Sequence, residues 1–165
     1  MPRVVISDTS PLHYLILIGH AELLSALYTE VLVPEAVALE LRQPSTPEPV
    51  RSWMEHSPSW LQTVSLSARN AAVPLADLDP GERDVILLAL QLNADLVIID
   101  EREGVEEARR LGLVVTGTLG VLDRASERGL IDLASAIDRL RHTSFRVDPA
   151  LLERLLPVDR LKRKE

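Results

Sequence analysis

Residues 79–100 read DPGERDVILLALQLNADLVIID, and this stretch predicts a helix followed directly by a strand. Its first four residues, DPGE, have the pattern of a capping box that opens a helix. Apolar residues then recur at helical spacing at Val85, Ile86, Ala89 and Leu90. The run LVIID that follows is apolar and ends in Asp100, which is typical of a buried strand of a parallel sheet. A helix–strand unit of this kind indicates an α/β protein.

The rest of the chain repeats this alternation. A strand is expected at residues 3–7, and Ser10 and Pro11 then have the pattern of an N-cap and first helical residue. Further strands are expected at 31–33 and 113–116, and helices at 20–28, 34–43, 104–111, 118–128, 132–141 and 149–156. The stretch 53–76 has no clear pattern. Alternating strands and helices predict a three-layer α/β/α sandwich with a mostly parallel central sheet. We expect one domain at residues 1–156 and a charged C-terminal tail at 157–165.

The composition excludes several classes of protein. The chain of 165 residues has no cysteine, which excludes disulfides, thiolate zinc sites and cysteine nucleophiles and is compatible with a reducing cytoplasm. Its only lysines are Lys162 and Lys164, so a P-loop kinase or a Schiff-base enzyme would lack its lysine. Neither a signal peptide nor an apolar run long enough to cross a bilayer is found. We therefore expect a cytoplasmic protein without a membrane partner.

The net charge of −7 argues at first against a nucleic-acid partner, because phosphate backbones attract basic surfaces. A bound cation would cancel part of this charge if some of the carboxylates were metal ligands. Arginines also gather in two places, although solvated helix faces and a frayed tail are the slightly better explanation for any one of them. They lie at Arg102, Arg109, Arg110, Arg124 and Arg128, and again beside the lysines near the C-terminus at Arg160 and Arg163.

Four acidic residues are candidates for a metal site. Asp8 and Asp100 each follow an apolar strand, and in open α/β sheets the functional crevice lies at the carboxyl ends of the strands where the strand order reverses. If the two strands are neighbours, the two aspartates face one another. With Glu40 and Glu82 they would form an oxygen-rich site suited to Mg²⁺ or Mn²⁺.

Each of these acids also has a purely structural explanation. Asp8 and Asp100 could cap the helices that follow them, although Ser10 is expected to cap the first. The capping box alone accounts for Glu82. Glu40 could be a solvated residue on an amphipathic helix. Spacing alone leaves both interpretations open.

The surroundings of the first two acids resemble motifs of the PIN-domain family. The segment VVISDTSPL at residues 4–12 is similar to its first motif, a strand ending in an aspartate followed by Thr or Ser. The segment AVALELRQ at residues 36–43 is similar to its second motif, a glutamate on a helix that is followed by an apolar residue. These two segments place Asp8 and Glu40 in the positions of the first two family acids.

The spacing of the other two acids carries the same resemblance. The third acid of the family opens a helix eighteen residues before the fourth, and here 100 − 82 = 18. The later segment at residues 115–131 resembles a less characterised PIN subfamily. Two departures are present: Ile98 stands where the family often has Thr or Ser, and Glu82 replaces the commoner aspartate. The resemblance covers roughly residues 3 to 131 and lies in the order and spacing of the motifs together.

The resemblance implies a Mg²⁺- or Mn²⁺-dependent ribonuclease with Asp8, Glu40, Glu82 and Asp100 as its catalytic and metal-binding residues. Neighbouring hydroxyl residues would orient these carboxylates, Thr9 and Ser10 being the candidates, with Ser10 acting on Asp8. The groups expected to bind the RNA backbone are Arg102, Arg109, Arg110 and Thr118.

The family includes VapC-type toxins of toxin–antitoxin pairs, so the resemblance also allows a toxin role and an antitoxin protein as partner. It further implies a homodimer, for which the apolar faces of the early and terminal helices provide surface. Two other functions stay open. The chain could be a catalytically silent PIN scaffold that binds a protein, or a nucleotide-binding or phosphotransfer α/β domain.

Overall fold

The computed structural model describes residues 2–67 and 77–156. Its centre is a five-stranded sheet in the order β3-β2-β1-β4-β5, in which every neighbouring pair is parallel. The strands are β1 (Val5–Ser7), β2 (Val31–Pro34), β3 (Leu61–Val64), β4 (Leu96–Ile98) and β5 (Val115–Thr116). The predicted α/β fold with a parallel central sheet is therefore confirmed.

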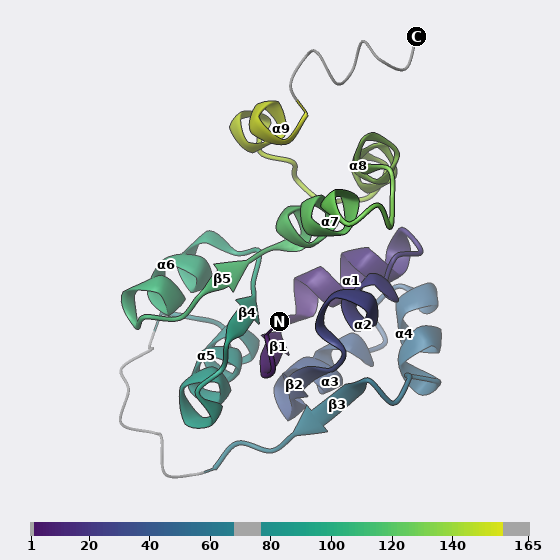
Figure 1. The fold of residues 1–165 in the computed structure, drawn as a ribbon. Coiled ribbons are helices and arrows are strands. Elements are labelled where there is room, and N and C mark those ends of the chain that lie inside the picture. The colour runs from purple at the N-terminus through teal and green to yellow at the C-terminus, as the bar shows by residue number, and fades with distance from the viewer. Residues whose placement is uncertain (1, 68–76, 157–165) are drawn as a thin grey trace, which may run out of the picture.

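Helices cover both faces of this sheet, as expected for a parallel sheet. They are α1 (Thr9–Leu17), α2 (Leu23–Tyr28), α3 (Glu35–Leu41), α4 (Glu48–Glu55), α5 (Pro80–Leu92), α6 (Arg102–Arg110), α7 (Thr118–Glu127), α8 (Leu133–Arg141) and α9 (Pro149–Leu155). Figure 1 shows α5 and α6 on one side of the sheet and α1, α2 and α7 on the other. Strands β1 and β4 are buried along their whole length between these layers. None of the helices in the described ranges is long and apolar enough to cross a membrane.

The core is aliphatic, as the low aromatic content requires. The largest side chains with almost no exposed surface are nearly all Leu or Ile, with one Met, namely Ile6, Leu12, Leu15, Leu24, Leu27, Leu41, Met54, Ile86, Leu88, Ile98, Ile99 and Leu122. They come from both helical layers and from the two central strands. Side chains from residues far apart in the sequence thus hold the sheet and its helices in one arrangement.

The order of the strands reverses beside β1. This strand lies between β2 and β4, and Ser7 is in register with Ile98 of β4. The N–H of Asp8 donates to the Ile98 carbonyl at 2.9 Å, so pairing continues to the end of β1. Asp8 and Asp100 consequently leave two adjacent strands at the same edge of the sheet, which is the condition under which the sequence predicted a shared site.

The structure corrects several predicted boundaries. The stretch without a clear pattern contains the last three residues of α4 and all of β3. The middle residues of β3 are both exposed, which hides the alternation expected of a strand. Helix α1 begins at Thr9 with Asp8 as N-cap, so Ser10 is inside the helix. Thr118 is likewise the first residue of α7, and Gly117 is its N-cap. The charged tail predicted at 157–165 lies outside the described residues.

Candidate active site

Asp8 stands between β1 and α1, where it is only 4% exposed. It occupies the N-cap position of α1, but its side chain accepts no capping hydrogen bond there. The pKa of Asp8 is raised to about 7, chiefly by burial. The Thr9 backbone N–H lowers the pKa, and the negative charges of nearby carboxylates, Asp79 first among them, raise it. Helix capping therefore does not explain why this carboxylate is buried.

Glu82 is in the first turn of α5 and is 6% exposed. The predicted capping box is half realised: Asp79 caps the helix by accepting the Glu82 N–H at 2.9 Å. The Glu82 side chain lines a cavity beside Asp8. Burial, and after it the negative charges of Asp79, Asp8 and Glu101, together raise the pKa of Glu82 to about 8. Since Asp79 provides the cap, the Glu82 carboxylate is not needed for it.

Asp100 follows β4 and is held by the start of α7. The Thr118 N–H donates to Oδ1 of Asp100 at 2.7 Å, and the Thr118 hydroxyl donates to Oδ2 at 2.6 Å. Burial raises the pKa of Asp100, and these two hydrogen bonds oppose the shift. A Cβ on Gly117 would lie 2.7 Å from Oδ1 of Asp100, which explains why a residue without a side chain precedes Thr118. The start of α7 thus positions this carboxylate.

Glu40 differs from the other three acids because it is exposed on α3. Its carboxylate is fixed by Thr9, whose hydroxyl donates to Oε2 of Glu40 at 2.8 Å. Thr9 therefore orients the carboxylate of Glu40. Ser10 lines the site, but among the described residues it makes no hydrogen bond to Asp8, the role predicted for it.

Three of the four predicted acids share one cavity of about 200 Å³ at this edge of the sheet. It is lined by Asp8, Thr9, Ser10, His13, Tyr14, Glu40, Asp79, Glu82 and Glu101. The closeness of the carboxylates is visible at Gly81, where an added methyl carbon would lie 3.2 Å from Glu40 Oε2, 3.5 Å from Asp79 Oδ1 and 3.7 Å from Asp8 Oδ1. Asp100 lines an adjoining larger cavity of about 620 Å³, and its charge contributes to the raised pKa of Asp8.

The sequence did not indicate four further residues of this cavity: Asp79, Glu101, His13 and Tyr14. Asp79 had been assigned only a capping role, although its position three residues before Glu82 puts both side chains in the same helical turn. Glu101 directly follows Asp100, and this acidic pair at a strand end was a usable signal. No sequence pattern marks His13 and Tyr14, which reach the cavity because α1 runs beside it.

The chemistry of these side chains fits a divalent cation. Carboxylate oxygens are the ligands that Mg²⁺ and Mn²⁺ prefer. The raised pKa values of Asp8 and Glu82 mean that ionised carboxylates are unfavourable here without a compensating positive charge. Among the described residues, no three Asp, Glu or His side chains already stand in an arrangement that would hold an ion. Binding an ion would therefore require these side chains to change their rotamers.

The residues predicted to bind RNA line neither cavity. Arg102 pairs with Glu106 at 2.9 Å, and Arg110 pairs with Glu107, all on α6. Arg109 is exposed on the same helix. Thr118 is fully buried, and its N–H and hydroxyl already bind Asp100. These placements leave the predicted RNA contacts without geometric support at the acidic cavity.

Comparisons with known proteins agree with this fold. A family model described as PIN domain matches residues 4–159. A solved structure, a PilT N-terminus domain protein from the hyperthermophilic archaeon Sulfolobus solfataricus P2, is similar with a TM-score of 0.52. The two chains are 15% identical, and the similarity covers 88% of this chain and 99% of the other, so it bears on the fold alone. No curated protein matches the sequence closely enough to count as a relative.

Proposed function

Because the chain belongs to the PIN-domain family, a nuclease fold, we propose that it is a Mg²⁺- or Mn²⁺-dependent ribonuclease that hydrolyses RNA phosphodiester bonds. The observation that carries the proposal is the cavity beside the reversal of strand order. There Asp8 and Glu82 are buried among other carboxylates and have pKa values raised to about 7 and about 8. Buried acidic groups that lack a cationic partner indicate a functional site.

The residues of the site would have different roles in binding the ion and in hydrolysis. Asp8, Glu82 and Asp100 would hold the ion, directly or through water, because they enter the site from three adjoining elements. Bound there, a divalent ion lowers the pKa of water and neutralises charge on phosphate oxygens. Glu40, fixed by the Thr9 hydroxyl, would complete the ligand set or orient the attacking water. Thr118 keeps both Asp100 oxygens in place.

A nucleotide-binding or phosphotransfer function has less support. Such a domain commonly places a phosphate on the backbone N–H groups at a helix N-terminus. At the start of α7, where the sequence suggested a phosphate contact, the Thr118 N–H already binds Asp100. That N–H is therefore not available to a phosphate, so we favour the nuclease.

The decisive experiment is a cleavage assay with the purified full chain on mixed RNAs. We expect cleavage with Mg²⁺ or Mn²⁺, none with EDTA, and none by Asp8→Asn in either condition. Thermal melts run in parallel should show that Mn²⁺ raises the melting temperature of the wild type and has a smaller effect on Asp8→Asn. Metal binding without cleavage of any RNA would support the silent scaffold, and a shift produced by nucleotides alone would support the nucleotide-binding domain.

A toxin role, an antitoxin partner and a cytoplasmic location are further parts of this proposal, and they rest on the family resemblance. Expression of the chain in growing cells distinguishes a toxin from a nuclease without toxicity. If the chain is a toxin, induced wild type should arrest growth, and Asp8→Asn should not. Unimpaired growth with active enzyme present would remove the toxin role and leave the ribonuclease intact.

A further inference from the structure

The larger cavity adjoins the acidic one and has walls of a different character. The two cavities share Ser10, Tyr14 and Glu101. Beyond these residues, the larger cavity is lined by the ends of β4 and β5, the start of α7, and residues 144–146, 148 and 151 near the C-terminus. Its volume of about 620 Å³ is within the range of pockets that hold small ligands. The acidic cavity, at about 200 Å³, has room for ions and water but little more.

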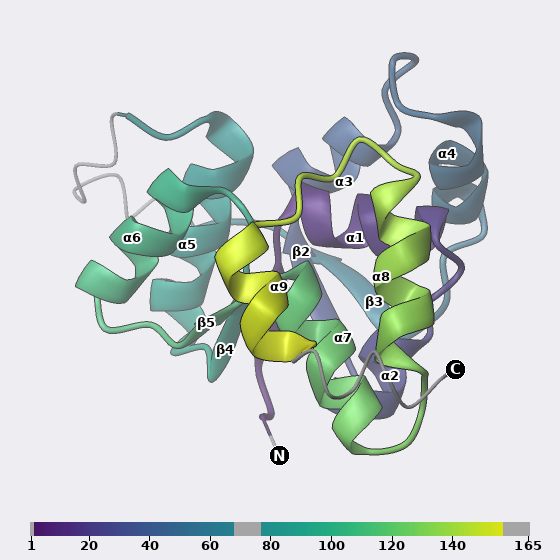
Figure 2. The same ribbon diagram turned by 90° about the horizontal axis from the view of Figure 1, so that it is seen from above.

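The connection between α8 and α9, residues 142–148, is fixed over this cavity. The Tyr14 hydroxyl and the Ser144 Oγ are 2.9 Å apart and form a hydrogen bond. The Tyr14 and Phe145 rings meet edge to face with their centroids 5.0 Å apart. Figure 2 shows the connection passing over α1 on its way to α9. Contacts with α1 thus place the α8–α9 connection beside the acids of the sheet edge.

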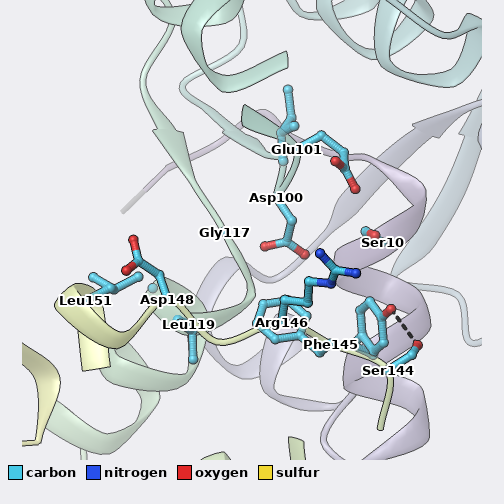
Figure 3. A pocket seen from close by; sticks show the side chains of 13 residues that line it. Ser10, Asp100, Glu101, Gly117, Leu119, Ser144, Phe145, Arg146, Asp148 and Leu151 are labelled. Atoms are coloured by element: carbon cyan, nitrogen blue, oxygen red, sulfur yellow. Dashed lines mark hydrogen bonds between the residues drawn. The ribbon is translucent and has the colours of Figure 1, made fainter. Parts of the chain in front are cut away.

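Arg146 of this connection is the only arginine or lysine among the residues that line the two cavities. Figure 3 shows its guanidinium directed toward Asp100 and Ser10. Among the described residues it nevertheless makes no ion pair and no hydrogen bond, although seven acids line the same two cavities. Its five N–H donors are therefore available, next to the carboxylates, for an anion that enters the cavity.

Besides its acids and serines, the larger cavity has apolar and aromatic walls. Tyr14 and Phe145 are two of only five aromatic residues in the chain, and they line the cavity together with Ile99, Leu119 and Leu151. A nucleobase has a flat apolar face that stacks on aromatic rings, and a phosphate matches the planar fork of an arginine. A cavity with an aromatic wall and one free guanidinium has the chemistry to take both.

We propose that the larger cavity is a nucleotide subsite of the nuclease, in which Arg146 binds a phosphate of the substrate strand and a base lies against Tyr14 and Phe145. This inference rests on the proposed ribonuclease function, and it names the residues that hold the strand next to the acidic cavity. It places the main phosphate contact on the α8–α9 connection instead of the predicted arginines of α6. The subsite provides positive charge that the acidic cavity itself lacks.

The test measures binding of a short, fluorescein-labelled, single-stranded RNA in Mn²⁺ by fluorescence anisotropy, in the Asp8→Asn background so that no cleavage occurs. Adding Arg146→Ala should weaken binding about tenfold or more, because hydrogen bonds from a charged donor are lost. Between about 50 and 200 mM salt, the slope of log affinity against log salt should fall by about 0.7. Arg146→Lys should keep the slope and recover only part of the affinity.

Two further variants separate the parts of the subsite. Arg141→Ala removes the same charge from an exposed residue at the end of α8 that lines neither cavity, and it should leave affinity and slope near those of the parent. Phe145→Leu keeps apolar bulk but removes the ring, so affinity should fall about fivefold or more with an unchanged salt slope. Melting temperatures of all variants are measured alongside, and Arg146→Gln replaces the alanine variant if the latter is unfolded.

The outcomes also distinguish this inference from the proposed function. If the wild type cleaves RNA, and Arg146→Ala and Arg141→Ala bind it equally well with the same salt slope, the subsite is wrong and the nuclease stands. If the wild type neither cleaves nor binds the RNA, the proposed function fails and the subsite fails with it. Cleavage by the wild type together with selective loss of affinity and slope at Arg146 supports both.

Discussion

Thr118 binds both carboxylate oxygens of Asp100, one through its backbone N–H at 2.7 Å and the other through its hydroxyl at 2.6 Å. The two residues are eighteen positions apart in the chain, on the two sides of β5. Thr118 is fully buried, so its hydroxyl has no other purpose that the structure shows. The start of α7 is therefore part of the acidic site, because it decides where the Asp100 oxygens lie.

Replacing Thr118 by valine should damage the site through Asp100. Thr118→Val has nearly the same shape but loses the hydroxyl donor, and the loss of a hydrogen bond to a charged group should lower the free energy of unfolding by about 1–3 kcal/mol. RNA cleavage should fall as well, because one Asp100 oxygen is no longer held. Urea unfolding and the cleavage assay check both effects. Thr118→Ser keeps the donor and should stay close to wild type in each, and equal activity of the valine and serine variants would contradict the positioning role.

The free energy of unfolding of the metal-free protein should depend on pH through the ionisation of Asp8. Its pKa is about 7 in the folded protein and 3.8 for an ordinary aspartate, so the folded state holds the proton more tightly. Asp8 therefore costs no stability below about pH 4 and becomes progressively destabilising as the pH rises to about 7. His13 and His20 have lowered pKa values, so their contribution makes the folded protein more stable as the pH rises. The effect of Asp8 is therefore measured as the difference in unfolding free energy between the wild type and a variant that keeps both histidines.

Asp8→Asn should thus become more stable than wild type, in EDTA, by an amount that grows between pH 4 and pH 7. Urea unfolding at each pH measures this difference. Asp138→Asn, at an exposed position of α8, is the matched control. Saturating Mn²⁺ should remove the advantage of Asp8→Asn, because the ion compensates the charge that only the wild type carries. A difference that shrinks with rising pH would mean that Asp8 is stabilised as a carboxylate without metal.

Glu82→Gln should separate helix capping from the role in the site. The cap of α5 is made by Asp79, so the glutamine variant should fold and, in EDTA, be at least as stable as wild type, because a buried carboxyl group with a pKa of about 8 is removed. Cleavage should fall by orders of magnitude. The matched variant Asp79→Asn keeps a side-chain oxygen that can accept the Glu82 N–H and removes a charge nearby. Full activity of Glu82→Gln would return this residue to a structural role.

The structure leaves less exposed apolar helix surface for the predicted homodimer than the sequence suggested. Leu23, Leu24 and Leu27 are buried within the chain, as are Leu133 and Ile137 of α8. What remains is the exposed Leu130 and the face of α9. Helix α9 has no buried residue, and its apolar face consists of the leucines at 151, 152 and 155 and the C-cap Leu156, all partly buried.

Light scattering at micromolar concentration should still give twice the chain mass of 18.3 kDa if this face pairs two copies. Leu155→Glu, which changes a residue outside both cavities, should then give the mass of one chain. A wild type that scatters as a single chain would refute the homodimer and leave the face to a different partner.

The sequence by itself determined the features that depend on neighbours in the chain. Apolar runs predicted β1 and β4, and the spacing of apolar residues predicted α5, because helix and strand periodicities are local properties. The two aspartates that end those strands could be named for the same reason. The sequence failed at β3, whose middle residues Gln62 and Thr63 are exposed, so burial does not produce the expected pattern there.

Only the tertiary structure decided which acids share a cavity and what holds them. The pairing of β1 with β4 brings residues about ninety positions apart into register, and no local pattern specifies a partner at that distance. The same holds for Thr9 beside Glu40, Thr118 on Asp100, and Arg146 over the sheet edge. Burial also sets the pKa values, because a carboxyl group has its ordinary pKa in the unfolded chain and loses its surrounding water only when the chain folds.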